Sequence, residues 1–138
     1  MHFALETDYA VRMIAVLADS TRNGVDSLGA ASLGEAACIP KPTALKVLRQ
    51  LKDRGLVHST MGVNGGYRLA RHPSDISLAD VITAIEGKIE ISRCLDDSYN
   101  CSRTGYSHGG CKFHNLFSGI NDRLISELSK VSFDGKNF

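Results

Sequence analysis

The chain has 138 residues, of which 43% are hydrophobic and 22% are charged, so it is long enough and apolar enough to fold as one domain, and wholesale disorder is excluded. Its longest uninterrupted apolar stretch, residues 13–18, is far shorter than the roughly 20 residues that cross a membrane, and Glu6, Asp8 and Arg12 stand where a signal peptide would be apolar. We therefore expect a cytoplasmic protein without a membrane partner, and the formal net charge of +1 excludes a uniformly basic or acidic chain.

The charge is unevenly distributed along the chain. Residues 41–72 carry seven cations and one anion, whereas residues 1–40 carry two cations and five anions, and residues 73–138 carry seven cations and nine anions. Clustered lysine and arginine residues are typical of a face that binds nucleic acid, because phosphate contacts need a local excess of positive charge. On charge alone, a basic surface that is simply solvated explains the pattern equally well.

The first elements follow from the spacing of apolar residues. Residues 5–18 have apolar positions close to one helical face, and a short helix is expected over residues 33–37. The two prolines around Lys41 end one element and permit the next to begin, since proline is tolerated at the first position of a helix. Apolar residues then recur every three or four positions over residues 43–54 until Gly55, which predicts a second helix after a tight turn.

A β-hairpin is expected next. Apolar and polar residues partly alternate over residues 56–60 and 67–70, on both sides of a glycine-rich tip, which completes a winged helix-turn-helix. The second helix presents side chains that can donate hydrogen bonds in a major groove, namely Thr43, Lys46, Arg49 and Gln50. They could also form the solvent-exposed face of an ordinary amphipathic helix. The basic segment, the turn and the hairpin coincide within about thirty residues, and this coincidence favours DNA binding.

Two more helices are expected after the hairpin. Residues 77–86 begin with Ser77 and Asp80 in a capping pattern, although aspartate is not the usual partner there. Apolar residues recur at helical spacing over residues 113–131, which corresponds to a helix of nearly 30 Å. This stripe is more than a small neighbouring helix can cover, so we predict that it packs against its copy in a homodimer. Packing inside one chain is the alternative.

A cluster of cysteines lies in the long connection between the last two predicted helices. Cys94, Cys101 and Cys111 are followed by His114, and the residues between them are polar and glycine-rich. Disulfides are not expected in a cytosolic chain, because the cell keeps its thiols reduced. Three thiolates and one further ligand fill either a tetrahedral zinc site or the outer positions of an iron-sulfur cluster.

The spacing of the cysteines favours a cluster over zinc. Structural zinc sites usually contain tight Cys-x₂₋₄-Cys pairs, and none occurs here, whereas a loose loop can surround a bulky cluster. Thiols without a metal are the third interpretation. Cys38, which small and apolar residues flank in the turn between two helices, is expected to be a buried structural cysteine and not a ligand.

Several motifs taken together resemble one bacterial family. These are residues 5–12 (LETDYAVR), residues 47–57 (VLRQLKDRGLV), residues 62–67 (GVNGGY) and the late loop with three cysteines. In this order they are similar to the winged-helix iron-sulfur regulators of the IscR, NsrR and RirA type, and the similarity spans nearly the whole chain. The resemblance implies a homodimer with crossed C-terminal helices, in which each cluster lies near the DNA-binding domain of the partner.

The resemblance leaves two residues as fourth ligand of the cluster. His114, three residues after Cys111, matches the histidine ligand of the IscR type. Asp8 matches the aspartate of the NsrR type, which reaches across from the other subunit. We favour Asp8 slightly for a [4Fe-4S] cluster and His114 for a [2Fe-2S] cluster, and His108 is a weaker candidate. Apart from the family, Asp8 could simply be a favourable anion in the first turn of a helix.

The chain departs from the family pattern at two DNA-reading positions. Met61 stands where the IscR type has an arginine before the first wing glycine, and Leu45 stands where it has a recognition glutamate. Neither the minor-groove contact nor the operator sequence can therefore be carried over from the family. Lys46 and Thr43 are the best candidates for base edges, and Arg49 is expected on the DNA backbone. The full set of expected DNA contacts is Thr43, Lys46, Arg49, Gln50, Lys52, Arg54, Asn64 and Arg68.

The sequence thus predicts a mainly α protein with a small β-hairpin. Residues 1–72 form a winged helix-turn-helix, and residues 73–138 carry the cluster-binding loop and a long C-terminal dimerisation helix. We expect a homodimeric DNA-binding transcription regulator, a repressor, whose operator binding depends on an iron-sulfur cluster that senses redox state, nitric oxide or iron. A winged-helix protein with a structural zinc or with no metal is the alternative. An enzyme is not expected, because no Cys-x-x-Cys pair, Ser/His/Asp arrangement or phosphate-binding loop is present.

Overall fold

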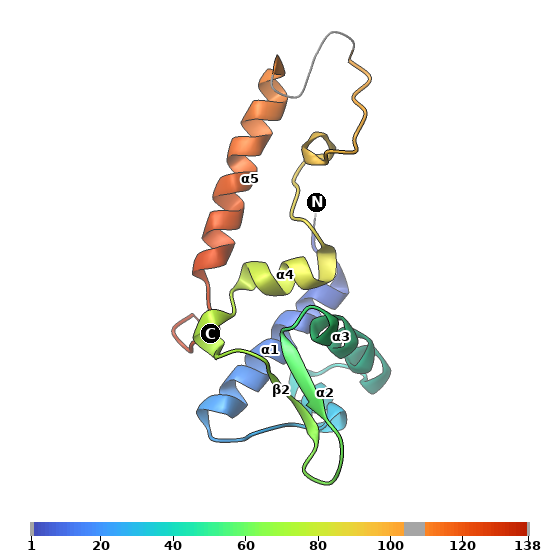
Figure 1. Ribbon diagram of the computed structural model, residues 1–138, viewed down its shortest axis with the longest axis vertical. Coiled ribbons are helices and arrows are strands. Elements are labelled where there is room, and N and C mark those ends of the chain that lie inside the picture. Colours follow the sequence, from blue (N-terminus) through green and yellow to red (C-terminus); the bar gives the residue numbers. More distant parts are fainter. Residues whose placement is uncertain (1, 104–109, 138) are drawn as a thin grey trace.

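The computed structural model describes residues 2–103 and 110–137. The elements are α1 (Leu5–Arg22), α2 (Ala30–Ala37), α3 (Lys41–Asp53), β1 (Val57–Thr60), β2 (Gly66–Leu69), the 3-10 turn η1 (Pro73–Asp75), α4 (Leu78–Glu86), the 3-10 turn η2 (Arg93–Leu95) and α5 (Lys112–Lys130). Figure 1 shows α1 to α4 and the hairpin gathered at one end, while α5 extends away from them. The mainly helical class with one small hairpin is confirmed. Within the described ranges no helix is both long and apolar enough to cross a membrane.

Helix α1 is longer than predicted, and only part of its predicted apolar face is buried. It continues to Arg22, and its last turn contains an Asp19–Arg22 ion pair (3.1 Å) and a hydrogen bond from the Thr21 hydroxyl to the carbonyl oxygen of Leu17 (2.9 Å). The side chains that α1 contributes to the core are Ala10, Met13, Ile14, Leu17 and Ala18. Leu5, which the apolar spacing assigned to that face, is 60% exposed.

The turn between α2 and α3 corrects the expectation for Cys38. This residue caps α2 in the left-handed conformation (φ 58°), and the backbone N–H of Ile39 donates to the carbonyl oxygen of Gly34 (2.8 Å). This is a common way to end a helix, and the chain reverses direction there. As a result Ile39 enters the core and Cys38 is exposed, so the prediction of a buried cysteine is wrong.

Helix α3 and the hairpin follow the expected pattern. The apolar stripe of α3 is buried and consists of Ala44, Val47, Leu48 and Leu51. Strands β1 and β2 pair antiparallel, with Val57 opposite Leu69 and Thr60 opposite Gly66. Leu28, in the connection between α1 and α2, pairs with Tyr67 on β2 through two backbone hydrogen bonds (3.0 and 2.7 Å). The hairpin is therefore fixed to the helices by its own β-bridge.

Helix α4 begins with the capping pattern that the sequence indicated. The Ser77 hydroxyl accepts a hydrogen bond from the backbone N–H of Asp80 (3.1 Å), and the Asp80 carboxylate accepts one from the backbone N–H of Ser77 (2.9 Å). Aspartate thus replaces the usual glutamate in a complete capping box.

The residues after α5 return to the main core. Phe133 is only 1% exposed, and its backbone N–H lies within hydrogen-bond distance of the carbonyl oxygens of Pro73 (3.2 Å) and Ile76 (3.3 Å). Its own carbonyl oxygen accepts a hydrogen bond from the guanidinium of Arg22 at the end of α1 (2.9 Å). The base of α5 is therefore anchored in the core that α1, α3 and α4 share.

Residues 87–111, called here the cysteine segment, connect α4 to α5. The buried side chain of Asn121 on α5 holds the start of this segment. Its amide donates to the carbonyl oxygen of Ile89 (2.8 Å), and its oxygen accepts from the backbone N–H of Ile91 (3.0 Å). Elsewhere the apolar stripe of α5 is poorly covered: Phe113 is 61% exposed and Leu116 is 57% exposed.

Candidate functional site

The residues expected to contact DNA lie on α3 and the hairpin. Thr43, Lys46, Arg49, Gln50 and Lys52 are on α3, Arg54 caps its C-terminal end, Asn64 is at the hairpin tip, and Arg68 is on β2. All are exposed except Thr43 and Gln50, which are half-buried. The Gln50 side-chain oxygen is buried and has no hydrogen-bond partner within the described part of the chain. Leu45 is 42% exposed on the same helix, so the surface is not purely polar.

Lys46 has an intramolecular partner that sequence reasoning missed. Its ammonium lies 3.2 Å from the carboxylate of Glu6 in the first turn of α1. The backbone N–H of Glu6 and then Lys46 hold the pKa of the Glu6 carboxyl below its usual value, so this group is anionic at neutral pH. A DNA phosphate that approaches Lys46 would therefore compete with Glu6 for its ammonium group. The two residues are forty positions apart, and no local pattern connects them.

The first turn of α1 is in turn fastened to the end of α4. One carboxylate oxygen of Glu86, the last residue of α4, accepts hydrogen bonds from the backbone N–H of Ala4 and from the Thr7 hydroxyl, each at 2.6 Å. Thr7 is 2% exposed, so this hydrogen bond gives a buried hydroxyl its acceptor. A continuous set of contacts thus runs from the start of the cysteine segment through Glu86 and α1 to Lys46 on α3.

The cysteine segment contains the three expected ligands as free thiols. Cys94 lies in η2 with its sulfur 3.3 Å from the Ser92 hydroxyl, Cys101 is half-buried, and Cys111 is the N-cap of α5. Within residues 2–103 and 110–137, no three cysteine, histidine or acidic side chains are gathered closely enough to hold a metal ion. The thiols thus share one segment but do not form a closed site.

Cys111 lies in an environment that favours the thiolate. The backbone N–H groups of His114 and Phe113 in the first turn of α5 lower the pKa of Cys111, and the nearby Arg103 guanidinium, 3.9 Å from the sulfur, lowers it further. A thiolate is the form in which cysteine binds metals. The N-terminal end of a helix stabilises an anion for the same electrostatic reason.

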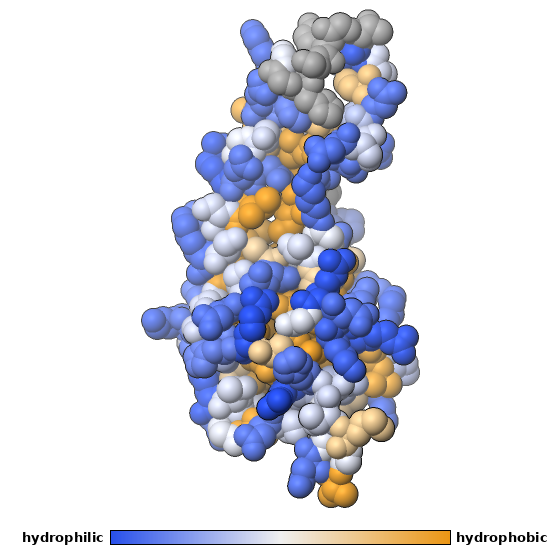
Figure 2. Space-filling model, viewed as in Figure 1, coloured by the Kyte–Doolittle hydropathy of each residue, from blue (hydrophilic) through white to orange (hydrophobic). Residues whose placement is uncertain are grey.

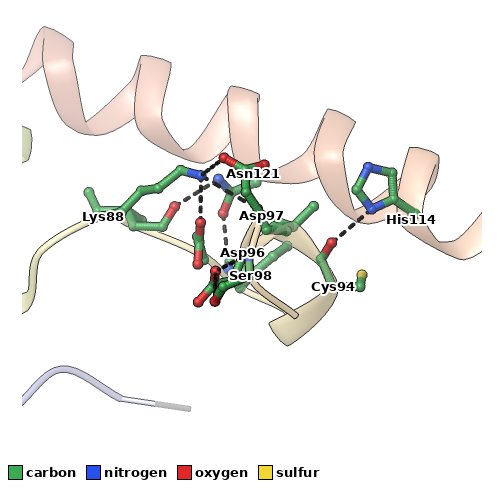
Figure 3. A network of polar contacts seen from close by, with 11 residues as sticks. Lys88, Cys94, Asp96, Asp97, Ser98, His114 and Asn121 are labelled. Carbon is green, nitrogen blue, oxygen red and sulfur yellow. Dashed lines mark hydrogen bonds and ion pairs between the residues drawn. The ribbon is translucent and has the colours of Figure 1, made fainter. Parts of the chain in front are cut away.

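His114 is held against the other end of the cysteine segment. Figure 3 shows its ring on α5 directed at the backbone carbonyl of Cys94, with Nδ1 3.0 Å from the oxygen. A carbonyl oxygen can only accept, so Nδ1 is the donor in this contact. Histidine ligands of metals are commonly oriented in this way.

The other proposed fourth ligands lie elsewhere. Asp8, in the first turn of α1, pairs with Arg12 (2.6 Å), and the structure does not bring it to the thiols of its own chain. That Asp8 binds the cluster of the partner subunit stays a prediction. His108 lies outside the described residues.

Comparison with known proteins agrees with this architecture. Residues 4–135 match the Rrf2 family, described as an iron-dependent transcriptional regulator. The helix-turn-helix transcriptional regulator IscR of Photorhabdus laumondii is 30% identical over 127 residues, which cover 91% of this chain and 73% of the relative.

Two solved structures share the fold. CymR (YrzC), the global cysteine regulator of B. subtilis, superposes with a TM-score of 0.75 at 20% identity, covering 99% of this chain and 96% of that one. IscR of T. potens superposes with a TM-score of 0.72 at 22% identity, covering 97% and 85%. The family resemblance predicted from the sequence is confirmed. The chain therefore belongs to the Rrf2 family and is a DNA-binding transcriptional regulator.

Proposed function

We propose that the protein is a homodimeric cytoplasmic repressor whose DNA binding is controlled by an iron-sulfur cluster. Residues 1–72 would read DNA, and residues 73–138 would bind the cluster and dimerise. Cys94, Cys101 and Cys111 would hold the cluster together with one further ligand. When bound, the cluster supplies a link between these residues that oxidation, nitric oxide or iron loss can break.

The donor set supports this proposal. Three free thiols are concentrated in one segment, and the lowered pKa of Cys111 favours the form that binds iron. His114, whose Nδ1 lies 3.0 Å from the carbonyl oxygen of Cys94, is the candidate fourth ligand inside one chain. Asp8 remains the candidate from the partner subunit. The presence of three free thiols in the one segment that leads into the helix of His114 is the observation that carries the proposal.

A homodimer is supported by the uncovered stripe of α5. Phe113, Leu116 and Ile120 are 61%, 57% and 37% exposed, and they lie on one helix at spacings of three and four residues. Figure 2 shows apolar atoms exposed in the upper half of the molecule, where α5 stands in Figure 1. A contiguous apolar helix face of this kind is typical of a protein interface.

The contacts of Glu86 with α1 and of Glu6 with Lys46 connect the cysteine segment to α3, the proposed DNA-reading helix. Gathering the three thiols would move the residues that follow α4, and Glu86 at the end of α4 holds the first turn of α1. Glu6 in that turn pairs with Lys46 on α3. A hundredfold change in operator affinity requires only ~2.7 kcal/mol of coupling, which a few such contacts can supply.

The experiment is anaerobic purification or reconstitution, followed by absorption spectroscopy with iron and sulfide analysis. We expect a coloured protein with matched iron and sulfide. Cys101→Ala should lose the colour but remain a folded dimer, whereas Cys38→Ala, the matched control outside the cysteine segment, should keep it. His114→Ala and Asp8→Ala then separate the two candidate fourth ligands.

Three outcomes would overturn the proposal. One is iron-free protein after reconstitution, and another is a colourless Cys101→Ala variant that still switches on and off DNA. Zinc without iron, with unfolding on chelation, would establish the alternative of a structural metal.

A further inference from the structure

Lys88 spans the cysteine segment from its start to the turn η2. It is the second residue after α4, and its ammonium lies 2.7 Å from Oε1 of Glu90 and 3.5 Å from the carbonyl oxygen of Leu95 in η2. The carboxylate of Asp97, just beyond η2, lies 3.9 Å away. One side chain thus closes residues 88–97, called here the Lys88 loop.

The contacts of Lys88 differ in strength. Glu90 is the strong partner, because its side chain is 17% exposed and its Oε1 atom is buried, so the ammonium compensates a carboxylate that has lost most of its water. Asp97 is 98% exposed, and an ion pair of that kind contributes little. The contact with Glu90 also raises the pKa of Lys88, so the ammonium is fully charged at neutral pH. The pair of Lys88 with Glu90 is therefore the closure of the loop.

Helix α5 fastens the Lys88 loop at two further points. Asn121 makes the two backbone hydrogen bonds described above near the start of the loop, and Nδ1 of His114 lies 3.0 Å from the carbonyl oxygen of Cys94 near its end. Figure 3 shows both attachments against α5, with Lys88 beside Asn121 and His114 turned toward Cys94. Protein contacts alone therefore attach Cys94 both to α5 and to the start of the cysteine segment.

The other two thiols are held differently. Cys111 is the N-cap of α5, so it is part of the end of that helix. Cys101 follows Cys94 in a stretch without a helix or strand, and it makes no hydrogen bond within the described part of the chain. The three thiols thus differ in how firmly the chain holds them.

Building on the proposed role of Cys94 as a ligand, we propose that Lys88 is a positioning residue for this thiol. The ion pair with Glu90 keeps the Lys88 loop closed, and the closed loop holds Cys94 in place, so less order has to be imposed when the cluster forms. Residues that hold a ligand in place commonly matter for a metal site without touching the metal.

The test uses the full chain after removal of metal with a chelator under reducing conditions, and measures how often the Lys88 loop opens. One readout is the rate at which iodoacetamide alkylates Cys94, with Cys101 followed in the same sample by tandem mass spectrometry. The second is hydrogen exchange of the Leu95 amide, which donates to the carbonyl oxygen of Ser92 (3.1 Å). Both rates follow the population of the open loop when reclosing is fast.

The variants separate the charge of Lys88 from other effects. Lys88→Gln removes the ammonium, and Lys88→Arg keeps a cation at this position. Lys130→Gln is the matched control, because Lys130 lies on α5, pairs with Glu127 at 2.8 Å and is 66% exposed, against 65% for Lys88.

We expect Lys88→Gln to speed both the alkylation of Cys94 and the exchange of the Leu95 amide about fivefold, the factor by which an ion pair of this kind shifts an opening equilibrium. Cys101 should react at its wild-type rate. Lys88→Arg should restore both rates, and Lys130→Gln should leave them unchanged. After reconstitution, Lys88→Gln should also release iron to a chelator faster than the wild type.

Equal alkylation of Cys94 in Lys88→Gln and the wild type would overturn the proposal. An equal rise at Cys101, or an equal effect of Lys130→Gln, would also overturn it, because the lysine would then act on the fold as a whole. Faster alkylation with unchanged iron release would leave Lys88 a structural contact only.

Unfolding of the metal-free chain would overturn the proposal as well, since protein contacts would then not hold Cys94. Reconstituted protein without iron is a different result. It would refute the cluster, while the alkylation and exchange rates would still decide whether Lys88 holds Cys94.

Discussion

Replacing Asn121 with alanine should loosen the start of the cysteine segment from α5. The substitution removes both hydrogen bonds that Asn121 makes, to the carbonyl oxygen of Ile89 and the backbone N–H of Ile91. Each buried group left unpaired costs about 1–3 kcal/mol, and the cost is smaller for Ile91, which is half-buried and can meet water. Alanine recovers about 0.5 kcal/mol through its helix propensity. We expect a net loss of ~2–3 kcal/mol in the free energy of unfolding.

The assay is urea unfolding followed by circular dichroism, at one protomer concentration because dimerisation contributes to stability. Asp122→Ala is the matched control. The Asp122 side chain is exposed, and its replacement by alanine makes the same change in helix propensity. This variant should shift the free energy of unfolding by less than ~0.5 kcal/mol. Hydrogen exchange adds a local measurement, because the amide of Ile91 should lose protection only in Asn121→Ala. Equal stability of the two variants, with Ile91 still protected, would refute the assignment of Asn121 as the connection.

Four further predictions concern the contacts of α1 and the ends of α4. Glu6→Gln removes the competitor of Lys46, so affinity for duplex DNA should rise a few-fold at low salt, and an unchanged binding curve would contradict this. Because the pKa of Glu6 is lowered, the pair is intact at neutral pH and is lost only as the pH falls through that lowered value, so DNA binding by the wild type should approach that of Glu6→Gln in acid. Glu86→Ala should cost about 1–3 kcal/mol in urea unfolding, because it leaves the buried hydroxyl of Thr7 without its acceptor, and Glu86→Gln should recover part of the loss. Ser77→Ala should lower stability by about 1 kcal/mol through loss of the cap, and a change within measurement error would contradict the capping geometry.

The regular elements could be predicted because they depend on local spacing. The stripe of α3, the capping box at Ser77 and the glycine-rich hairpin follow from residues a few positions apart. The buried face of α1 was harder to predict from the sequence, because a helix in contact with several elements has no single apolar stripe. Leu5 is apolar but lies beyond the packed region, whereas Thr7 is polar and buried because Glu86 accepts its hydrogen bond.

The candidate site was predicted in its residues and not in its geometry. Cys38 shows one reason: its neighbours are small and apolar, but a left-handed cap turns it outward, and cap conformation depends on how the next helix packs. The pairing of Lys46 with Glu6 shows another, since it joins residues that only the tertiary fold brings together. The arrangement of the three thiols around the proposed cluster would depend on the cluster itself, so it cannot be derived from the chain alone. The three cysteine ligands, the fourth ligand and the DNA contacts stay predictions.

The position of Phe133 changes how alleles of this gene should be judged. A nonsense codon at that position would spare residues 1–132, yet it would delete an aromatic side chain that is 1% exposed in the core. Loss of a buried phenylalanine costs about 3–5 kcal/mol, a large part of the stability of a small domain. Such a truncation would retain the candidate DNA contacts and the three cysteines of the cysteine segment. It would still behave as a loss-of-function allele, because the protein would misfold and be degraded.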